Sequence, residues 1–265
     1  MIQPKIRLWD HPLSPYAQKV RIALREKGVD FEAVTPMGLG AGSGMEDFLA
    51  ASPRGEVPAL IDGETRVFDS TIILEYLDET WPKPPLLPES PAERARVRMI
   101  EEVMDTHYEA INWALGEIGW FKRAEGELAS ELVEAARLQT AGFHTWLEGQ
   151  LGERTWFNGA AFGRGDLSVV PYVAASAALG NPPPERSRLA AWLARALERP
   201  SVAATVGEAR GFDRGTVDVA DLVKRGLFKR EYRDHRLEWM MKSGGCDIVL
   251  AGLAADNIRF APDFG

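Results

Sequence analysis

Cysteine is nearly absent from this 265-residue chain, which contains one thiol, Cys246. A single cysteine excludes an intrachain disulfide and a dithiol redox centre. The four histidines are scattered along the chain, and none has a partner at the spacing of a zinc site. We therefore exclude disulfide-stabilised, dithiol and structural-zinc proteins, and we expect no metal site.

Long apolar runs and excess positive charge are also missing. The N-terminus lacks the apolar stretch of a signal peptide, and no later segment approaches the ~18 uninterrupted apolar residues of a membrane span. The net charge of −8 repels a phosphate backbone, and no run of lysine and arginine compensates for it locally. We predict a cytoplasmic protein that binds neither membranes nor nucleic acid.

The spacing of apolar residues predicts alternating strands and helices in the first 80 or so positions. Strands are expected at residues 6–9, 31–34, 57–61 and 66–68, and helices at 16–27, 45–51 and from 70 onward. A crossover helix makes the first two strands parallel, and Asp62-Gly63 predicts an antiparallel hairpin between the last two. The expected order is β-α-β-α-β-β-α, with a glycine-rich loop at 36–44.

A domain boundary is expected where the chain is repeatedly interrupted by proline, at Pro82, Pro84, Pro85, Pro88 and Pro91. Beyond it, helical periodicity at 92–120, 124–151, 167–179 and 186–198 predicts an all-α bundle. We divide the chain into domains at 1–81 and 92–211 and a C-terminal extension at 212–265. In the extension we expect a long amphipathic helix over 222–241 and a short helix over 247–253.

Three N-terminal motifs carry a family resemblance. They read HPLSPYAQKVRIALREKG, ASPRGEVPALIDG and VFDSTIILEYLDE, in that order. Together they resemble the cytosolic glutathione transferase family, and the helical second domain extends the resemblance to about residue 210. The resemblance implies a thioredoxin-like α/β domain followed by an all-α domain, glutathione as co-substrate, a homodimer, and a role in detoxification.

Ser14 is the expected catalytic residue. It precedes Pro15, which suits the first turn of a helix, so the hydroxyl and the helix N-terminus point at one small volume. A thiolate there would accept a hydrogen bond and be stabilised by the helix dipole. Taken alone, a Ser-Pro pair is a common helix cap. Tyr16 is the competing hydroxyl, and we assign it to the wall of the substrate pocket because it matches the aromatic residue that follows this pair in the family.

The remaining motifs supply a peptide cradle. Pro58 stands at the start of a strand, where its missing N–H weakens pairing; the alternatives are an ordinary trans proline and a cis bond. In the fold that the resemblance implies, a cis bond turns the backbone of Val57 outward to pair with glutathione. Asp69-Ser70 begins a helix that can hold the ammonium and carboxylate of the γ-glutamyl end, although the pair is equally a plain cap.

One region departs from the family pattern. The segment PMGLGAGSGMEDF contains no basic side chain for the glycyl carboxylate of glutathione. Backbone N–H groups, Arg54 and the partner subunit remain as alternatives, and we include Arg54 in the glutathione-binding set. In the second domain, Asp166 follows Gly163 in half of a capping box, since glycine has no side chain, and we assign Asp166 to folding.

The second substrate is expected between the domains, as a small apolar electrophile. Its pocket is predicted to include Leu13, Tyr16, Tyr108, Asn112 and Trp113. The extension is expected to pack on the bundle and cover this pocket, with its charged residues on a solvated helix face. The leading hypothesis is a glutathione transferase. The alternatives are a non-catalytic binding or interaction module of the same fold, and a glutathione-dependent isomerase, dehalogenase or ether-cleaving enzyme.

Overall fold

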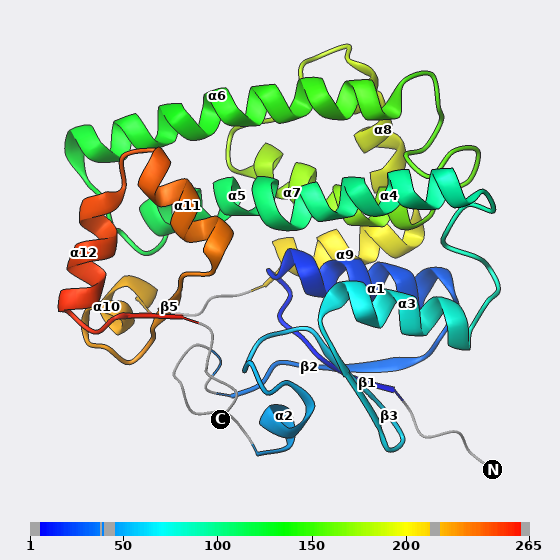
Figure 1. Ribbon diagram of the computed structural model, residues 1–265, viewed down its shortest axis with the longest axis horizontal. Helices are drawn as coiled ribbons and strands as arrows, with labels where there is room; N and C mark the ends of the chain where they lie inside the picture. The colour runs from blue at the N-terminus through cyan, green and yellow to red at the C-terminus, as the bar shows by residue number, and fades with distance from the viewer. Residues whose placement is uncertain (1–5, 38, 40–45, 213–217, 261–265) are drawn as a thin grey trace.

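The N-terminal unit of the computed structural model has the order expected from the sequence (Figure 1). The structure describes residues 6–37, 39, 46–212 and 218–260. The elements are β1 (Ile6–Trp9), α1 (Pro15–Glu26), β2 (Phe31–Val34), α2 (Glu46–Ala51), β3 (Ala59–Asp62), β4 (Thr65–Phe68) and α3 (Ser70–Thr80). The sheet order is β2-β1-β3-β4; β1 and β2 are parallel, and the other neighbours are antiparallel. The thioredoxin-like fold is confirmed.

The sheet is covered on both faces. Figure 1 shows α1 and α3 between the sheet and the helical domain, and α2 on the opposite side. The predicted apolar stripe of α1 faces inward, because Val20, Ala23 and Leu24 are all fully buried. This packing places Ser14 and Pro15, at the N-terminus of α1, in the wall of a large cavity.

The second domain is entirely helical in the part that the structure describes. Its elements are α4 (Pro91–Val103), a π-helical turn η1 (Met104–Tyr108), α5 (Glu109–Gly119), α6 (Gly126–Leu151), α7 (Arg164–Ala178), α8 (Arg188–Leu197) and α9 (Pro200–Arg210). The first three follow one another without a gap, as the predicted helix over 92–120 requires. The sequence did not predict α9. None of the described helices combines the length and the apolar composition needed to cross a membrane.

One apolar core joins the two domains. It contains Ile22 of α1 and Leu77 of α3 together with Ile100 of α4, Tyr172 of α7 and Val202 of α9. Complete burial of one such aliphatic side chain contributes about 1.5–3 kcal/mol. The N-terminal unit is therefore held on the bundle by a continuous packed interior.

Asp166 occupies the structural position that the sequence predicted. Its buried carboxylate accepts hydrogen bonds from the Gly163 N–H (3.1 Å), the Phe157 N–H (2.8 Å) and the Trp192 indole (2.8 Å). A Cβ at position 163 would overlap the Asn158 amide and a backbone carbonyl oxygen. Glycine is therefore required by close packing, and only half of the capping box can form.

The C-terminal extension differs from the prediction. It forms α10 (Val219–Lys224), β5 (Arg230–Glu231), α11 (Asp234–Lys242), α12 (Cys246–Ala254) and β6 (Ile258–Arg259), with β5 and β6 parallel. The expected single helix over 222–241 is wrong. The chain leaves α10 at Gly226, whose φ of 70° favours glycine, and residues 230–233 are then extended against β6 and the pocket. The short helix expected over 247–253 is present as α12.

Candidate functional site

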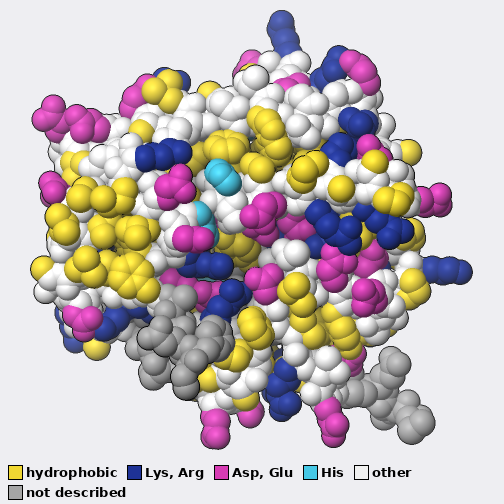
Figure 2. Space-filling view, in the orientation of Figure 1, with side chains coloured by type: hydrophobic (Ala, Val, Ile, Leu, Met, Phe, Trp, Pro, Cys, Tyr) yellow, Lys and Arg dark blue, Asp and Glu magenta, His cyan; other side chains and the backbone are white. Residues whose placement is uncertain are grey.

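A cavity of about 1200 Å³ opens between the N-terminal unit, α5 and the C-terminal extension. Small-molecule sites commonly have volumes of roughly 300–1,000 Å³, so this cavity is large enough for two small ligands. Figure 2 shows positive and negative side chains close together around the hollow between the extension and the N-terminal domain. The cavity therefore has charged as well as apolar walls.

Nearly all of the predicted site residues line this one cavity. They are Leu13, Ser14, Tyr16, Arg54, Val57, Pro58, Asp69, Ser70, Asn112 and Trp113. Tyr108 does not line it, which corrects the prediction for that residue. Its side chain is fully buried, and its hydroxyl lies 2.9 Å from Nε2 of His144 on α6. The last position of the π-helical turn thus directs the phenol into the bundle core instead of the cleft.

Ser14 caps α1. Its Oγ accepts a hydrogen bond from the Ala17 N–H at 3.3 Å, and Pro15 follows at the first helical position. Because Oγ is the acceptor in that bond, the hydroxyl proton is available to a ligand in the cavity. The positive end of the α1 dipole points the same way. This end of α1 is suited to an anion.

The Val57-Pro58 peptide bond is cis, as predicted. Among the described residues, no hydrogen bond within the chain involves the backbone of Val57. Its N–H and C=O are therefore available to an extended peptide lying in the cavity. This is the observation by which a peptide such as glutathione fits the site.

Asp69 adopts a strained backbone at the start of α3, with a φ of 73°. Such a conformation costs on the order of 1–3 kcal/mol in a non-glycine residue and is concentrated at functional sites. The Asp69 carboxylate accepts hydrogen bonds from the Thr71 N–H (3.0 Å) and from Nη2 of Arg54 (3.0 Å). Arg54 is thus directed at Asp69. Ser70 begins α3 beside this pair and also lines the cavity.

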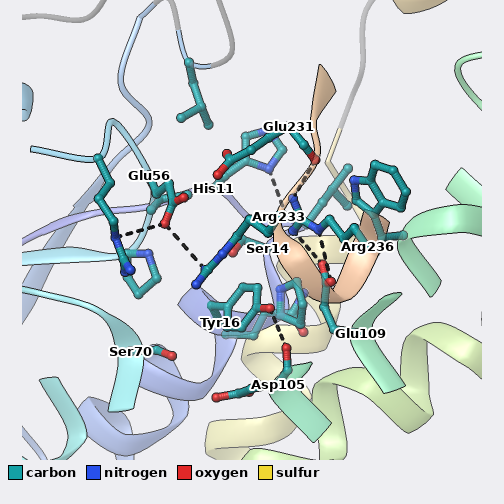
Figure 3. Close-up of a pocket in the computed structure, with 18 of the residues that line it drawn as sticks. His11, Ser14, Tyr16, Glu56, Ser70, Asp105, Glu109, Glu231, Arg233 and Arg236 are labelled. Carbon is teal, nitrogen blue, oxygen red and sulfur yellow. Dashed lines mark hydrogen bonds and ion pairs between the residues drawn. The ribbon is translucent and has the colours of Figure 1, made fainter. Parts of the chain in front are cut away.

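The Tyr16 hydroxyl is committed to the protein. It donates to the backbone carbonyl of Asp105 at 2.7 Å. Burial raises the pKa of Tyr16 well above its ordinary value, so the phenol remains protonated at neutral pH. Figure 3 shows Tyr16 beside Asp105, below Ser14. The geometry therefore favours Ser14 over Tyr16 as the hydroxyl that faces a bound anion.

A buried ion cluster joins α1 to the helical domain, and the sequence reasoning missed it. Nζ of Lys19 lies 2.9 Å from Glu101 and 2.6 Å from Asp105. Burial raises the pKa of Asp105 to about 6 despite the neighbouring Lys19 charge. The available signal was the four-residue spacing of Glu101, Asp105 and Glu109, which in a regular α-helix predicts that all three lie on one face.

The C-terminal extension docks on the next acid of that face. Arg236 donates two hydrogen bonds to Glu109, at 3.1 and 2.7 Å, and Nε2 of His235 lies 3.0 Å from the same carboxylate. Burial alone would raise the pKa of Glu109, but the Arg236 charge and these hydrogen bonds lower it to about 2. Farther along α5, Arg230 pairs with Glu117. The predicted solvated face of the extension is therefore wrong, because these side chains line the cavity.

Glu56 links the two walls of the cavity. Its Oε2 lies 3.3 Å from Nε of Arg54 and 3.6 Å from Nη1 of Arg233. Oε1 of Glu56 and Oε1 of Glu231 are both buried, with no donor among the described residues. Burial, together with Glu231, raises the pKa of Glu56 to about 7. The Glu56 carboxylate that pairs with Arg233 therefore has a second, buried oxygen that can accept a proton.

The far end of the cavity is aromatic. Trp113, Trp120, Phe121 and Phe228 line it, and the rings of Phe121 and Phe228 stack with centroids 5.9 Å apart. The Arg230 guanidinium lies 3.8 Å from the centroid of Phe121. Within the described ranges, no three acidic, histidine or cysteine side chains form a group that could hold a metal ion. Of the glycine-rich loop, residues 38 and 40–45 lie outside the described residues.

Comparisons with known proteins agree on one family. Residues 8–85 match the family model described as "Glutathione S-transferase, N-terminal domain". Glutathione S-transferase U28 of Arabidopsis thaliana is 34% identical over 211 residues, which are 77% of this chain and 89% of that protein. A stringent starvation protein A homolog of Coxiella burnetii is 32% identical over 206 residues, covering 76% of this chain and 91% of that protein.

Solved structures show the same architecture. A glutathione S-transferase from Rhodospirillum rubrum superposes with a TM-score of 0.66 at 28% identity, covering 82% of this chain and 99% of that one. Rice GST1 in complex with glutathione gives a TM-score of 0.65 at 26% identity, covering 80% of this chain and 100% of that one. Both matches leave about a fifth of this chain without a counterpart.

Proposed function

The chain belongs to the cytosolic glutathione transferase family, and from this premise we propose that Ser14 stabilises the thiolate of bound glutathione for attack on an electrophile. The observation that carries the proposal is the convergence in one cavity of Ser14, Ser70 and the backbone of Val57, which has no hydrogen-bond partner in the described part of the chain. Glutathione would lie along Val57, with its γ-glutamyl end at Asp69 and Ser70. Its sulfur would then reach the Ser14 hydroxyl and the α1 N-terminus.

The catalytic gain would come from the ionised thiol and from proximity. A free cysteine thiol has a pKa near 8.5, so a hydrogen bond and a helix N-terminus that lower it increase the thiolate fraction at neutral pH. Binding both substrates in one cavity makes the attack effectively unimolecular. The aromatic end of the cavity, at Trp113 and Phe121, supports an apolar group on the second substrate. Isomerisation, dehalogenation and ether cleavage would use the same thiolate.

Calorimetry and kinetics test this proposal together. Wild type should bind glutathione in a calorimetric titration. Ser70→Ala should bind it more weakly, because the variant loses a hydroxyl at the γ-glutamyl end. Ser14→Ala should retain glutathione binding, but its turnover number for a chromogenic aryl halide should fall about 10²–10³-fold. This is the loss typically caused by removing one hydrogen-bond donor to a developing anion. Tyr16→Phe is the control and should change turnover less than tenfold. Equal losses in the two hydroxyl variants would refute the role of Ser14.

A non-catalytic module is the second candidate. Two observations support it: the match to a stringent starvation protein A homolog over 91% of that protein, and the Arg233–Glu56 ion pair that lies inside the cavity. If this ion pair keeps the glutathione site closed, glutathione will not bind at millimolar concentration. Wild-type calorimetry therefore separates the two candidates before any variant is made.

We also propose a homodimer as the working form. Large apolar side chains are exposed on α3 of the N-terminal unit and on α4 of the helical domain. Ile72 of α3 is 55% exposed and Met99 of α4 is 61% exposed. An exposed apolar face of this kind supports contact with a second copy. Light scattering after size exclusion should give twice the mass of the 29.3 kDa chain. A monomer at micromolar concentration would refute this part of the proposal.

A further inference from the structure

Four arginines of the extension line the cavity, and among the described residues one of them has a longer ion pair than the other three. The four are Arg230, Arg233, Arg236 and Arg259. Three have tight carboxylate partners, which are Glu117 for Arg230, Glu109 for Arg236 at 2.7 Å, and Glu231 for Arg259 at 2.7 Å. In the described part of the chain, the nearest carboxylate oxygen to Arg233 is 3.6 Å away, on Glu56. Arg233 is therefore the cation of this wall that is best able to accept another anion.

Arg233 reaches the place where the sulfur of glutathione is expected. It stands at the start of α11, and Figure 3 shows its side chain extending beside Ser14 toward Glu56. Its electrostatic neighbours are Glu56, Tyr16, Arg236 and Glu231, and Tyr16 lies two residues after Ser14 on the chain. The Arg233 side chain is only 29% exposed, so an anion paired with it is less screened by water than at the surface.

We propose that Arg233 is a second catalytic residue, which pairs with the thiolate of bound glutathione while Glu56 receives the proton that the thiol releases. The inference rests on the proposed function, because it assumes that glutathione occupies the cavity with its sulfur at Ser14. In the free protein, Arg233 pairs with the Glu56 carboxylate. When glutathione enters, the guanidinium moves from that carboxylate to the sulfur.

The exchange conserves charge and protons. The S–H bond of glutathione breaks, an O–H bond forms on Glu56, and the Arg233 cation changes its partner from carboxylate to thiolate. No oxidant, reductant or further ion is needed. The cavity holds the same net charge before and after ionisation, which avoids the cost of adding an unpaired anion to a partly buried site.

Glu56 is suited to take the proton. The charged groups that face it are Arg54 from its own loop, Glu231 from β5 and Arg233, the residue before α11. Removing Arg233 leaves one cation and two carboxyls, and within the described ranges the buried Oε1 atoms of Glu56 and Glu231 already lack donors. A proton between the two carboxyls supplies that donor. The geometry therefore favours protonation of Glu56 at the moment when Arg233 turns to the sulfur.

The first test measures the pKa of the bound thiol from the ultraviolet absorbance of the thiolate against pH. Wild type, Arg233→Gln, Arg233→Lys and Arg225→Gln are each saturated with glutathione. We expect Arg233→Gln to raise the pKa of the bound thiol by about one unit, which lowers the thiolate fraction at pH 6.5 about tenfold. Arg233→Lys keeps the charge and should stay within about threefold of wild type. Arg225 is an exposed arginine of the same extension outside the cavity, so Arg225→Gln should match wild type.

The second test counts protons. Glutathione is added to weakly buffered protein at pH 7.5 with a pH indicator. Wild type should release well under half a proton per bound glutathione, because Glu56 retains it. Glu56→Gln cannot accept a proton and should release about one for each thiolate formed. Equal release by the two proteins, at equal thiolate fraction, would overturn the role of Glu56.

The outcomes separate this inference from the proposed function. If wild type does not bind glutathione, the proposed function is wrong and the inference falls with it. If Arg233→Gln binds glutathione with the wild-type thiol pKa, the proposed function survives and the role of Arg233 is overturned. If Arg233→Gln does not bind at all, Arg233→Lys decides. Restored binding with an unshifted thiol pKa supports the inference, and restored binding with a raised pKa overturns it.

Discussion

The N-terminal unit and the C-terminal extension form opposite walls of one cleft, and both form ion pairs with the continuous helix made of α4, η1 and α5. The N-terminal wall uses Lys19 against Glu101 and Asp105, and the extension uses Arg236 against Glu109. Their apolar support differs. The N-terminal unit shares the larger core with the bundle, whereas the extension packs Trp239 and other residues against α5 and α6 in a second, smaller cluster.

This difference indicates that the N-terminal wall is rigid and that the extension is the wall that opens. A wall backed by the main core holds its backbone in place, which suits the rigid peptide cradle at Val57 and Ser70. A wall held on the bundle by a smaller apolar cluster opens more readily, since segments with less buried apolar area open at lower free energy. The extension carries Arg233 and covers the cleft, so its separate opening would admit substrate.

The largest expected effect is on the N-terminal wall. Lys19→Met leaves Glu101 and Asp105 near each other in a buried seam without their shared cation. Breaking a buried pair from one side costs on the order of 3–5 kcal/mol, so we expect about 4 kcal/mol less stability in urea unfolding. Arg137→Met is the control, because both it and its partner Glu134 are exposed, and it should leave the urea unfolding midpoint unchanged. Similar costs for the two variants would contradict a central role for the seam.

The next effect should be confined to the extension. Arg236→Met removes the cation from buried Glu109 and should cost the extension about 3 kcal/mol. Hydrogen exchange should accelerate in α11 and α12 while α1 keeps its protection. Equal acceleration in α1 would contradict the separate support of the two walls.

Acid should loosen the same wall. The pKa of Glu109 falls from 4.5 to about 2 on folding, so its stabilising contribution is complete above pH 4.5 and is lost as the pH falls toward 2. Pepsin cleavage within residues 218–260 of wild type should rise across that window. Arg236→Met should show a smaller rise, because its Glu109 lacks the cation that lowers the pKa.

The smallest effect concerns the contact between the walls. The pKa of Glu56 rises from 4.5 to about 7 on folding, so the stability that its protonated form contributes is present below pH 4.5 and lost as the pH rises through 7. Glu56→Gln mimics the protonated carboxyl. Its Tm should equal that of wild type at pH 5 and exceed it by a few degrees at pH 8. A lower Tm than wild type at pH 8 would contradict the carboxyl pair.

The two walls also differ in how well the sequence predicted them. The N-terminal strands, the cis bond before Pro58 and the cap at Ser14 depend on neighbours within a few residues, so local patterns predict them. The inward arginines of the extension depend on Glu109 and Glu117, more than 100 positions away. The break after α10 lies at Gly226, a local signal that the sequence reasoning missed. Tyr108 was misplaced for a related reason, because an unrecognised π-helical turn changes which face each residue occupies.

The most direct test of the central claim is a pH titration of the thiolate absorbance in the glutathione complex of wild type and Ser14→Ala. If Ser14 and the α1 N-terminus stabilise the sulfur, the thiol pKa in wild type will lie at least about one unit below the 8.5 of a free cysteine. Ser14→Ala will bind glutathione with a thiol pKa closer to that reference. A wild-type complex that titrates near 8.5, or an unchanged pKa in Ser14→Ala, would contradict the account.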